Sequence, residues 1–349
     1  MIGIRKEPVK PVIQISLIAA LFLLCCDLHI SAPEVKGPPD SLFEYLSGKA
    51  VLEILKNGND FWFVSVTKSD SIPDPFTSDS LYDMQLSWWR DAGFDYCDLS
   101  LLHIGRLTAD HHGRIYAACG SRIVRVQDPH TLTDFLIHTE PVSALAFDAD
   151  EHVWIGGYNQ GLCVRGDDDV VCFNTSDSML PTNEIHDIVI DRSHVVWVAL
   201  GVDYNGLLRM DGENRTFFRC SDLTGDRYHY FADLLLDKED HLWVAWQSGC
   251  LTTTDGSDWI FSKPGIPGDC SKNILGLVTS DADGNILAVY MDRYLPQDDI
   301  LSDIYCRSGD AWIRLAENVR GRIYDIELDN NRRLWIGTNR GICTLDISG

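Results

Sequence analysis

The chain has 349 residues, with 52 acidic side chains against 29 basic ones and a formal net charge of −23. A chain this acidic repels phosphate backbones, so nucleic acid is not an expected partner. With 45% hydrophobic and 23% charged residues, the composition is that of a globular protein, not of a disordered or polytopic membrane protein. The length would suit two average domains, but large all-β folds reach it as one domain.

The N-terminus reads as an export signal. A basic stretch (Arg5 to Lys10) precedes an apolar run (Val12 to Cys26) that falls short of a membrane-spanning helix. The end of this run resembles a bacterial lipoprotein signal with Cys26 as the lipidated residue, although Cys25 stands where a smaller residue is usual. The alternative is an uncleaved anchor.

These features predict a signal peptide over residues 1–26, a linker over 27–40 and one folded domain over 41–349. We expect an exported protein of the cell envelope, in the periplasm or at the outer membrane or cell surface. An N-terminal lipid anchor would be its only membrane attachment.

Seven repeats follow one another along the chain. The recurring unit is an apolar strand ending in Asp, a short polar turn, and a second strand with a large residue six positions after that Asp. LDKEDHLW (Leu236–Trp243) is one copy, and the two earliest copies are weaker. A period in the forties, with units rich in Val, Ile, Trp and Tyr and cut by Gly and Asp, indicates the four-stranded blades of a β-propeller. Six or eight blades are the neighbouring possibilities. The seven anchor residues are Trp62, Tyr116, Trp154, Trp197, Trp243, Leu287 and Trp335.

The third unit shows the expected strands of a blade most clearly. They run over 142–148, 152–158, 161–165 and 169–174. The chain stops after the third strand of the last blade, and Ser41–Ser47 precedes the first repeat without an assignment. We expect Ser41–Ser47 to complete the last blade and latch the ring, which would also cover an open sheet edge.

Several of these units resemble the two-component regulator propeller, the periplasmic sensor module of many bacterial hybrid histidine kinases. The lead Ser178-Met179-Leu180-Pro181 and the run from Leu334 to Ile342 (LWIGTNRGI) carry the resemblance. It implies a sensor-like propeller that binds an oligosaccharide or a surface-glycan fragment. The chain looks like a stand-alone, exported copy, so that any signalling would need a partner. The repeated residues specify the fold much better than the function.

Four positions before the repeat Asp, on the innermost strand, three blades carry a carboxylate and one carries a guanidinium. These residues are Asp187, Asp233, Asp325 and Arg106. Near the channel axis they could form a cation site or a polar floor for a ligand. The alternative, which we favour, is that they accept hydrogen bonds from the backbone of neighbouring strands.

Aromatic residues outside the repeat register are further candidates for ligand contact. These are Trp88, Trp89 and Trp246, which we place at the channel mouth. The tryptophans at the repeat register are expected to fill the core between blades. Long connections between the second and third strands lie on the same face as the connections between blades. We call this face the loop face and expect the binding site there.

Two possible metal motifs have simpler interpretations. Asp281–Asn285 is similar to a calcium loop but lacks its turn glycine and its final Glu, so we expect a hairpin turn. His111 and His112 fall in the equivalent turn of blade two, with no third ligand at a suitable spacing.

Cys163 and Cys172 face each other if a two-residue turn at 167–168 joins the last two strands of blade three. Directly opposed cysteines on paired strands have the geometry of a disulfide. We therefore predict a bond between them.

Three functions remain open. The first is a non-catalytic, sensor-like propeller without a required cofactor, whose partner is a glycan, another small molecule or an envelope protein. The second resembles virginiamycin-lyase-like and gluconolactonase-like propeller enzymes, with a divalent cation held by Asp187, Asp233 and Asp325 and an acid/base at His186 or His229. No His/Glu constellation matches those families residue by residue. The third is a scaffold that only docks other proteins.

Overall fold

The computed structural model describes residues 46, 48–67, 83–90, 93–96, 101–102, 104–128, 130–166, 169–177, 179–201, 204, 206–225, 231–246, 249–262, 273–281, 283–292, 300–309 and 311–347. These residues form 28 strands and one short helix. The strands make seven separate antiparallel sheets. The predicted seven-bladed β-propeller is therefore confirmed.

The first three blades occupy residues 49 to 173. Their strands are β1 (Lys49–Asn57), β2 (Asp60–Thr67), β3 (Asp83–Arg90), β4 (Gly93–Tyr96) and β5 (Leu101–Leu102) in blade one; β6 (Ile104–Ala109), β7 (Ile115–Cys119), β8 (Arg122–Asp128) and β9 (Thr131–Ile137) in blade two; and β10 (Val142–Phe147), β11 (Val153–Gly157), β12 (Leu162–Arg165) and β13 (Val170–Phe173) in blade three. The strands of blade three lie within one residue of the predicted bounds.

The remaining blades follow in chain order. Blade four has β14 (Ile185–Ile190), β15 (Val196–Leu200), β16 (Gly206–Asp211) and β17 (Asn214–Arg219), followed by the helix α2 (Cys220–Thr224); blade five has β18 (Phe231–Leu236), β19 (Leu242–Trp246), β20 (Gly249–Thr253) and β21 (Ile260–Ser262); blade six has β22 (Asn273–Ser280), β23 (Ile286–Asp292), β24 (Leu301–Ser308) and β25 (Ala311–Arg320); and blade seven has β26 (Ile323–Leu328), β27 (Arg333–Thr338) and β28 (Gly341–Asp346).

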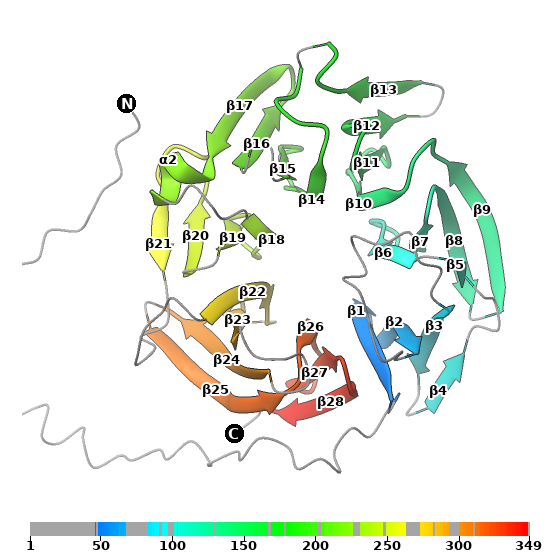
Figure 1. Ribbon diagram of the computed structural model, residues 1–349, viewed down its shortest axis with the longest axis vertical. Coiled ribbons are helices and arrows are strands. Elements are labelled where there is room, and N and C mark those ends of the chain that lie inside the picture. The colour runs from blue at the N-terminus through cyan, green and yellow to red at the C-terminus, as the bar shows by residue number, and fades with distance from the viewer. Residues whose placement is uncertain are drawn as a thin grey trace, which may run out of the picture.

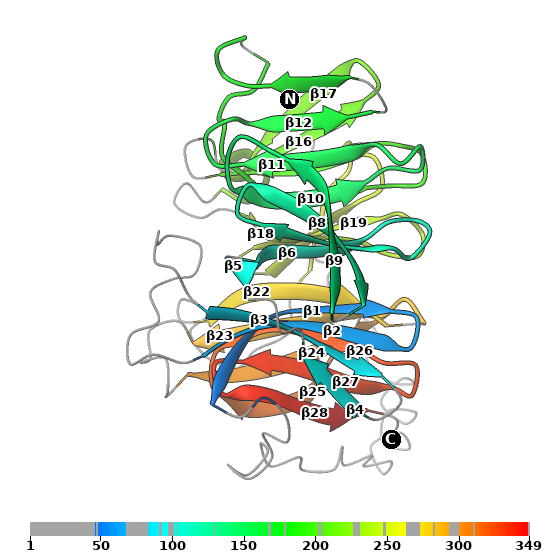
Figure 2. The ribbon, with the colours of Figure 1, turned by 90° about the vertical axis from the view of Figure 1, so that its right-hand side faces the viewer.

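The blades stand around a central axis, with the first strand of each blade innermost (Figure 1). Each innermost strand contacts the innermost strands of both neighbouring blades, and β26 of the last blade contacts β1 of the first. The side view shows the first and last blades next to each other (Figure 2). The ring is therefore closed.

The repeat Asp caps the turn between the first two strands of a blade. In blade five, the Asp237 carboxylate accepts the backbone N–H groups of Glu239 and His241 at 3.0 and 2.9 Å and the indole N–H of Trp243 at 2.9 Å. Asp240 in this turn has a left-handed φ of 65°. The same turn recurs at Asp110, Asp148, Asp191, Asp281 and Asp329. The spacing from Asp to Trp thus encodes a capped turn whose last partner is the core tryptophan.

A β-bulge interrupts the innermost strand of every blade at an equivalent position. In blade four the register shifts between Ile185 and Asp187, and the other six inner strands shift at the corresponding place. A bulge leaves a backbone N–H without its ladder partner and re-aims the next side chain. Because the bulge recurs in all seven blades, it determines which residue of each inner strand lies on the channel wall.

The hydrophobic core lies between blades, as expected for sheets that expose both faces until they stack. Trp197 is 1% exposed and packs with Phe231 and Trp246 of blade five. Trp335 packs against Phe61 and Phe63 of blade one, at the closure of the ring. The interpretation of the repeat tryptophans as core is confirmed.

The described part of blade seven has three strands. Just before β1, Leu46 packs on Trp335 and Ile342, and the Gly48 N–H donates to the Arg340 carbonyl at 3.4 Å. Most of the expected latch Ser41–Ser47 lies outside the described residues, as do the signal peptide, Cys26 and the linker. Among the described residues, no helix is long and apolar enough to cross a membrane.

Candidate functional site

The bulges place one residue from each blade at the same level of the channel wall. We call these seven residues the channel ring: Glu53, Arg106, Ala144, Asp187, Asp233, Leu277 and Asp325. Four carboxylates and one guanidinium therefore share one level. The four channel candidates predicted from the sequence do converge. The carboxylates that act on the charge of Arg106 and raise its pKa are Asp187, Glu53, Asp233 and Asp325.

Glu53 was missed from the sequence because the first turn of blade one is shorter. Asn57 pairs directly with Asp60, whereas Phe147 pairs with Val153 in blade three. Counting back from Trp62 therefore gives Leu52, one residue short of the true ring position. Aligning the units on the hairpin instead would have found Glu53.

Three ring carboxylates join adjacent blades. Asp187 accepts the N–H of Leu234 in blade five at 3.0 Å, and Asp325 accepts the N–H of Ile54 in blade one at 2.7 Å. Glu53 accepts the N–H of Leu107 in blade two at 2.9 Å. Each acceptor satisfies an N–H beside the bulge of the next blade. Hydrogen bonding to neighbouring strands, the interpretation favoured from the sequence, therefore describes Asp187 and Asp325 among the predicted channel carboxylates.

Arg106 spans three blades. Its Nε donates to the carbonyl of Ser143 in blade three at 3.1 Å, and its Nη2 donates to the carbonyl of His186 in blade four at 3.1 Å. The same Nη2 lies 3.7 Å from the Asp187 carboxylate. The ring position of blade three, which the Arg106 side chain passes on its way to blade four, holds the small residue Ala144. Burial lowers the pKa of Arg106, but the surrounding carboxylates, Asp187 foremost, more than offset this and raise it.

Carboxylates near the closure of the ring are hard to ionise. Burial raises the pKa of Glu53 to about 7, although Arg106 and the Leu107 N–H act against it. Burial also raises the pKa of Glu327, two residues after the ring position of blade seven, to about 7. The pKa of Asp325 lies well above its ordinary value for the same reason, with nearby Glu53 adding to the effect. Blades seven and one thus meet across a cluster of acidic groups.

The three off-register tryptophans are not part of the channel ring. Trp88 and Trp89 lie on β3, the third strand of blade one, where Trp88 stacks on Trp62 with ring centroids 4.9 Å apart and Trp89 contacts Trp335. Trp246 is 7% exposed and packs between blades four and five. All three contribute to packing between or within blades.

A cluster of polar residues lies on the loop face between blades three and four. Tyr158 follows β11, Glu184 immediately precedes β14, and His186 is the second residue of β14. The His186 Nε2 is 3.0 Å from the Glu184 Oε1, and the Tyr158 ring meets the imidazole edge-on at 6.5 Å between centroids. Glu184 and His186 are 22% and 26% exposed. His186 was predicted from the sequence as an acid/base candidate, whereas Glu184 and Tyr158 were not predicted.

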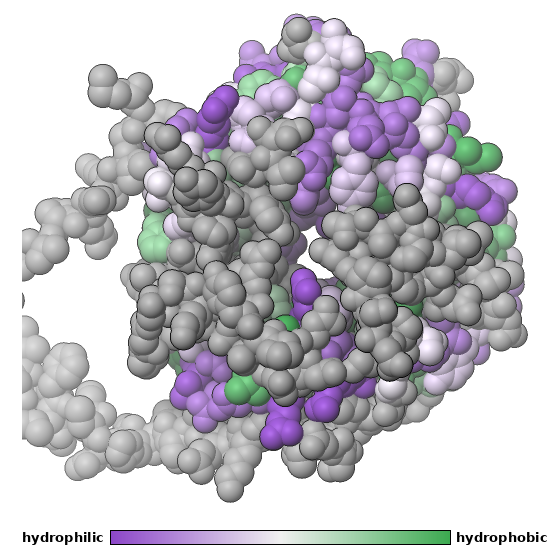
Figure 3. Space-filling view, in the orientation of Figure 1, coloured by the Kyte–Doolittle hydropathy of each residue, from purple (hydrophilic) through white to green (hydrophobic). Residues whose placement is uncertain are grey.

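The space-filling view of the loop face shows a hollow at its centre, bordered by hydrophilic residues on the side of β10 and β14 (Figure 3). The other acid/base candidate, His229, lies outside the described residues.

The opposite face, which we call the turn face, carries the turns between first and second strands. At least one polar contact joins each neighbouring pair of these turns around the whole ring. The contacts are Asn57 to the Gly113 carbonyl, Arg114 to Glu151, His194 to Asp150, Arg192 to Asp240, Lys238 to the Asp283 carbonyl, Arg332 to Asp283, and Asn330 to Asn59. This belt stiffens the turn face and closes the ring there without the latch.

Two turns of the belt bring three potential metal ligands together within the described residues: Asp148, Asp150 and His152 in blade three, and Asp237, Glu239 and His241 in blade five. In each group the carboxylate of the repeat Asp, Asp148 or Asp237, already contacts two backbone N–H groups, the histidine ring and the tryptophan indole N–H. Asp281–Asn285 is likewise a hairpin turn, as expected, with the Asp281 N–H donating to the Asn285 carbonyl. These groups build turns.

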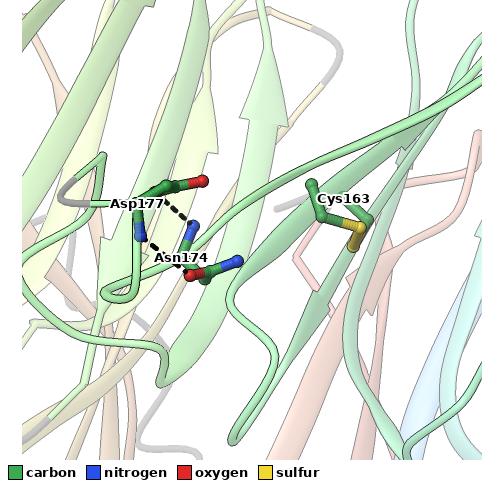
Figure 4. The surroundings of a disulfide bond; sticks show 4 residues. Cys163, Asn174 and Asp177 are labelled. Atoms are coloured by element: carbon green, nitrogen blue, oxygen red, sulfur yellow. Dashed lines mark hydrogen bonds between the residues drawn. A yellow bond between two sulfur atoms is a disulfide. The ribbon is translucent and has the colours of Figure 1, made fainter.

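The predicted disulfide is confirmed. Cys163 and Cys172 occupy directly paired positions on β12 and β13, with Cα atoms 4.0 Å apart, and form a bond. The bond lies beside the turn that Asn174 and Asp177 form at the end of blade three (Figure 4). This turn begins the connection to blade four that ends at Glu184. The disulfide therefore anchors the loop that carries part of the polar cluster.

Comparison with known proteins agrees with this architecture. The family model described as "Two component regulator propeller" matches residues 320–340, within the last repeat. The resemblance to this family is therefore confirmed. No curated protein matches the chain significantly.

Solved propellers have the same fold at low identity. The extracellular domain of the hybrid two-component system BT3049 from B. thetaiotaomicron superposes with a TM-score of 0.64 and 16% identity, over 87% of this chain and 40% of that one. The extracellular domain of BT4673 from the same organism has a TM-score of 0.62 and 15% identity, over 85% of this chain and 38% of that one. A xyloglucanase from Xanthomonas campestris has a TM-score of 0.62 and 13% identity, over 87% of this chain and 53% of that one. The chain spans about two-fifths of the two extracellular domains, and identities this low establish the fold alone.

Proposed function

We propose that the protein is an exported, non-catalytic propeller that binds a ligand on its loop face, in the manner of a sensor module. The channel mouth supports this most directly. It combines a central hollow with polar side chains that converge from several blades, whereas the belt occupies the turn face. Ligand sites favour concave regions with a few convergent polar groups.

The proposed ligand is an oligosaccharide, and an envelope protein is the other partner to test. Similarity to extracellular domains of two-component sensors favours export and ligand recognition. Lipidation at Cys26 would hold the protein at the membrane. Mass spectrometry of the mature N-terminus would detect an acylated Cys26 and its loss in Cys26→Ala.

The enzyme alternative rests on the channel carboxylates and on the fold shared with a xyloglucanase. Against a metal in the ring, Asp187 and Asp325 each already accept two backbone N–H groups. A cation would have to displace bonds that hold adjacent blades together.

A thermal-shift screen of the purified protein tests the proposal. The panel holds divalent metals with and without a chelator, followed by neutral and acidic oligosaccharides. A ligand at 100 times its dissociation constant adds about 2.7 kcal/mol of stability. Stabilisation by a saccharide without metal supports the binder. Stabilisation by a metal that is lost in Asp233→Asn would instead support the enzyme, and silence throughout would favour protein docking.

A further inference from the structure

The cluster of Tyr158, Glu184 and His186 has a defined geometry that the blade repeat does not require. Neither Tyr158 nor Glu184 occupies a ring position or a capped turn. The Glu184 carboxylate orients the His186 imidazole at 3.0 Å, and the Tyr158 ring packs edge-on against it. About a quarter or less of the Glu184 and His186 side chains is exposed, so the pair is held in place and still reaches solvent.

Backbone hydrogen bonds hold this cluster rigidly. The Gly157 N–H donates to the Gly161 carbonyl, which closes the turn that carries Tyr158. The Gly161 N–H donates to the Asn183 carbonyl at 3.1 Å and ties that turn to the residue before Glu184. Preorganised groups bind at lower entropic cost than groups that order on binding.

A glycine makes room for the Glu184 side chain. The Gly201 N–H donates to the Glu184 carbonyl at 2.7 Å, and a Cβ on Gly201 would lie 2.3 Å from the Glu184 Cγ and Cδ. An alanine at 201 would therefore push the Glu184 side chain out of its place. Gly201→Ala is thus a means of moving the carboxylate without altering it.

The chemistry of the cluster fits a sugar ring. A carboxylate accepts hydrogen bonds from hydroxyl groups, an imidazole exchanges them, and an aromatic ring covers the apolar C–H face of a sugar. The charges at the cluster disfavour an anion. Arg106, the guanidinium of the channel ring, is already engaged by two carbonyls and Asp187, and Glu184 places a carboxylate inside the cluster.

We propose that Tyr158, Glu184 and His186 form a subsite for a neutral saccharide and select against uronic-acid and sulfated glycans. This rests on the proposed ligand-binding function and adds the place and the charge class of the ligand. Asn159 and Gln160 follow Tyr158 in the same turn.

Isothermal titration of the purified protein with neutral hexasaccharides (of xylose, mannose and β1,4-glucose) and with oligogalacturonate and a heparin hexasaccharide tests this subsite. Tyr158→Ala and Gly201→Ala should each weaken the neutral ligand at least tenfold. Glu184→Gln should narrow the preference for neutral over acidic ligands. Tyr96→Ala, which removes an exposed tyrosine from the outer strand of blade one, is the matched control and should bind as the wild type does. Melting without ligand checks that each variant folds.

Each result has a distinct meaning. Tenfold losses in Tyr158→Ala and Gly201→Ala, with unchanged binding in Tyr96→Ala, support the subsite. A neutral saccharide that binds both variants as tightly as the wild type overturns the subsite and leaves the proposed function standing. Tighter binding of oligogalacturonate or heparin by the wild type overturns the charge class. No binding to any saccharide overturns the subsite, and the wider thermal-shift panel then decides the proposed function separately.

Discussion

Glu327 should make the protein less stable as the pH rises from 4.5 to about 7. Burial raises its pKa from the ordinary 4.5 to about 7 in the folded state, although Lys56 and a long hydrogen bond from Thr279 act against it. A carboxylate that binds its proton more tightly when folded stabilises the protein fully below pH 4.5. This stability is lost progressively between pH 4.5 and about 7. A shift of this size corresponds to about 3 kcal/mol, a figure that residual solvent screening would reduce.

Glu327→Gln tests this because the amide keeps the shape of the protonated acid and cannot ionise. The variant should match the wild type within about 0.5 kcal/mol at pH 4.5 and exceed it by up to about 3 kcal/mol at pH 8. Urea unfolding followed by tryptophan fluorescence measures both values. Glu213→Gln, at an exposed turn, is the control and should show no such pH dependence. The same difference between Glu327→Gln and wild type at both pH values would refute burial as the controlling factor.

Three further predictions concern stability. Cys172→Ser removes the bond to Cys163, which closes a loop with a sequence separation of 9; this should cost about 2.6 kcal/mol in urea unfolding, and equal stability of the variant and the oxidised wild type would contradict it. Asp237→Ala leaves two backbone N–H groups and the Trp243 indole without their acceptor, so we expect a loss of about 2–3 kcal/mol; a loss near zero would show that water replaces the cap. Deletion of Ser41–Ser47 should lower the melting temperature by several degrees if this segment latches blade seven, and unchanged melting would refute the latch.

The repeat made the fold predictable because it encodes local chemistry. In blades three, five and seven the repeat Asp accepts the indole N–H of the repeat Trp, so the spacing between the two residues follows from one capped turn. The Cys163–Cys172 pair was predictable for a similar reason, since a short hairpin fixes its own register.

The site was less predictable because it depends on contacts between blades. Glu53 escaped notice through a one-residue difference in a turn, and Tyr158 and Glu184 lie in connections that the repeat does not constrain. Trp88 and Trp89 were predicted at the channel mouth because they are outside the repeat register. They pack against other aromatic rings instead, because blade one has an aromatic core of its own. Only the assembled ring shows which polar residues remain near the channel.

The two faces of the ring have different roles: contacts that stabilise the ring lie at the turn face and along the inner strands, and the proposed binding site lies at the loop face. A continuous belt of polar contacts joins the turns of one face, and ring carboxylates join the inner strands by backbone hydrogen bonds. Rigidity at these places lets the loop face vary without loss of the fold.

Hydrogen exchange of the protein with and without the neutral hexasaccharides tests the central claim of ligand binding at the loop face most directly. We predict slower exchange of the amides in 157–161 and 183–187 with ligand present, and unchanged exchange in the turns of the belt. Protection confined to the turn face, or no protection at the channel mouth while the ligand is bound, would contradict the account.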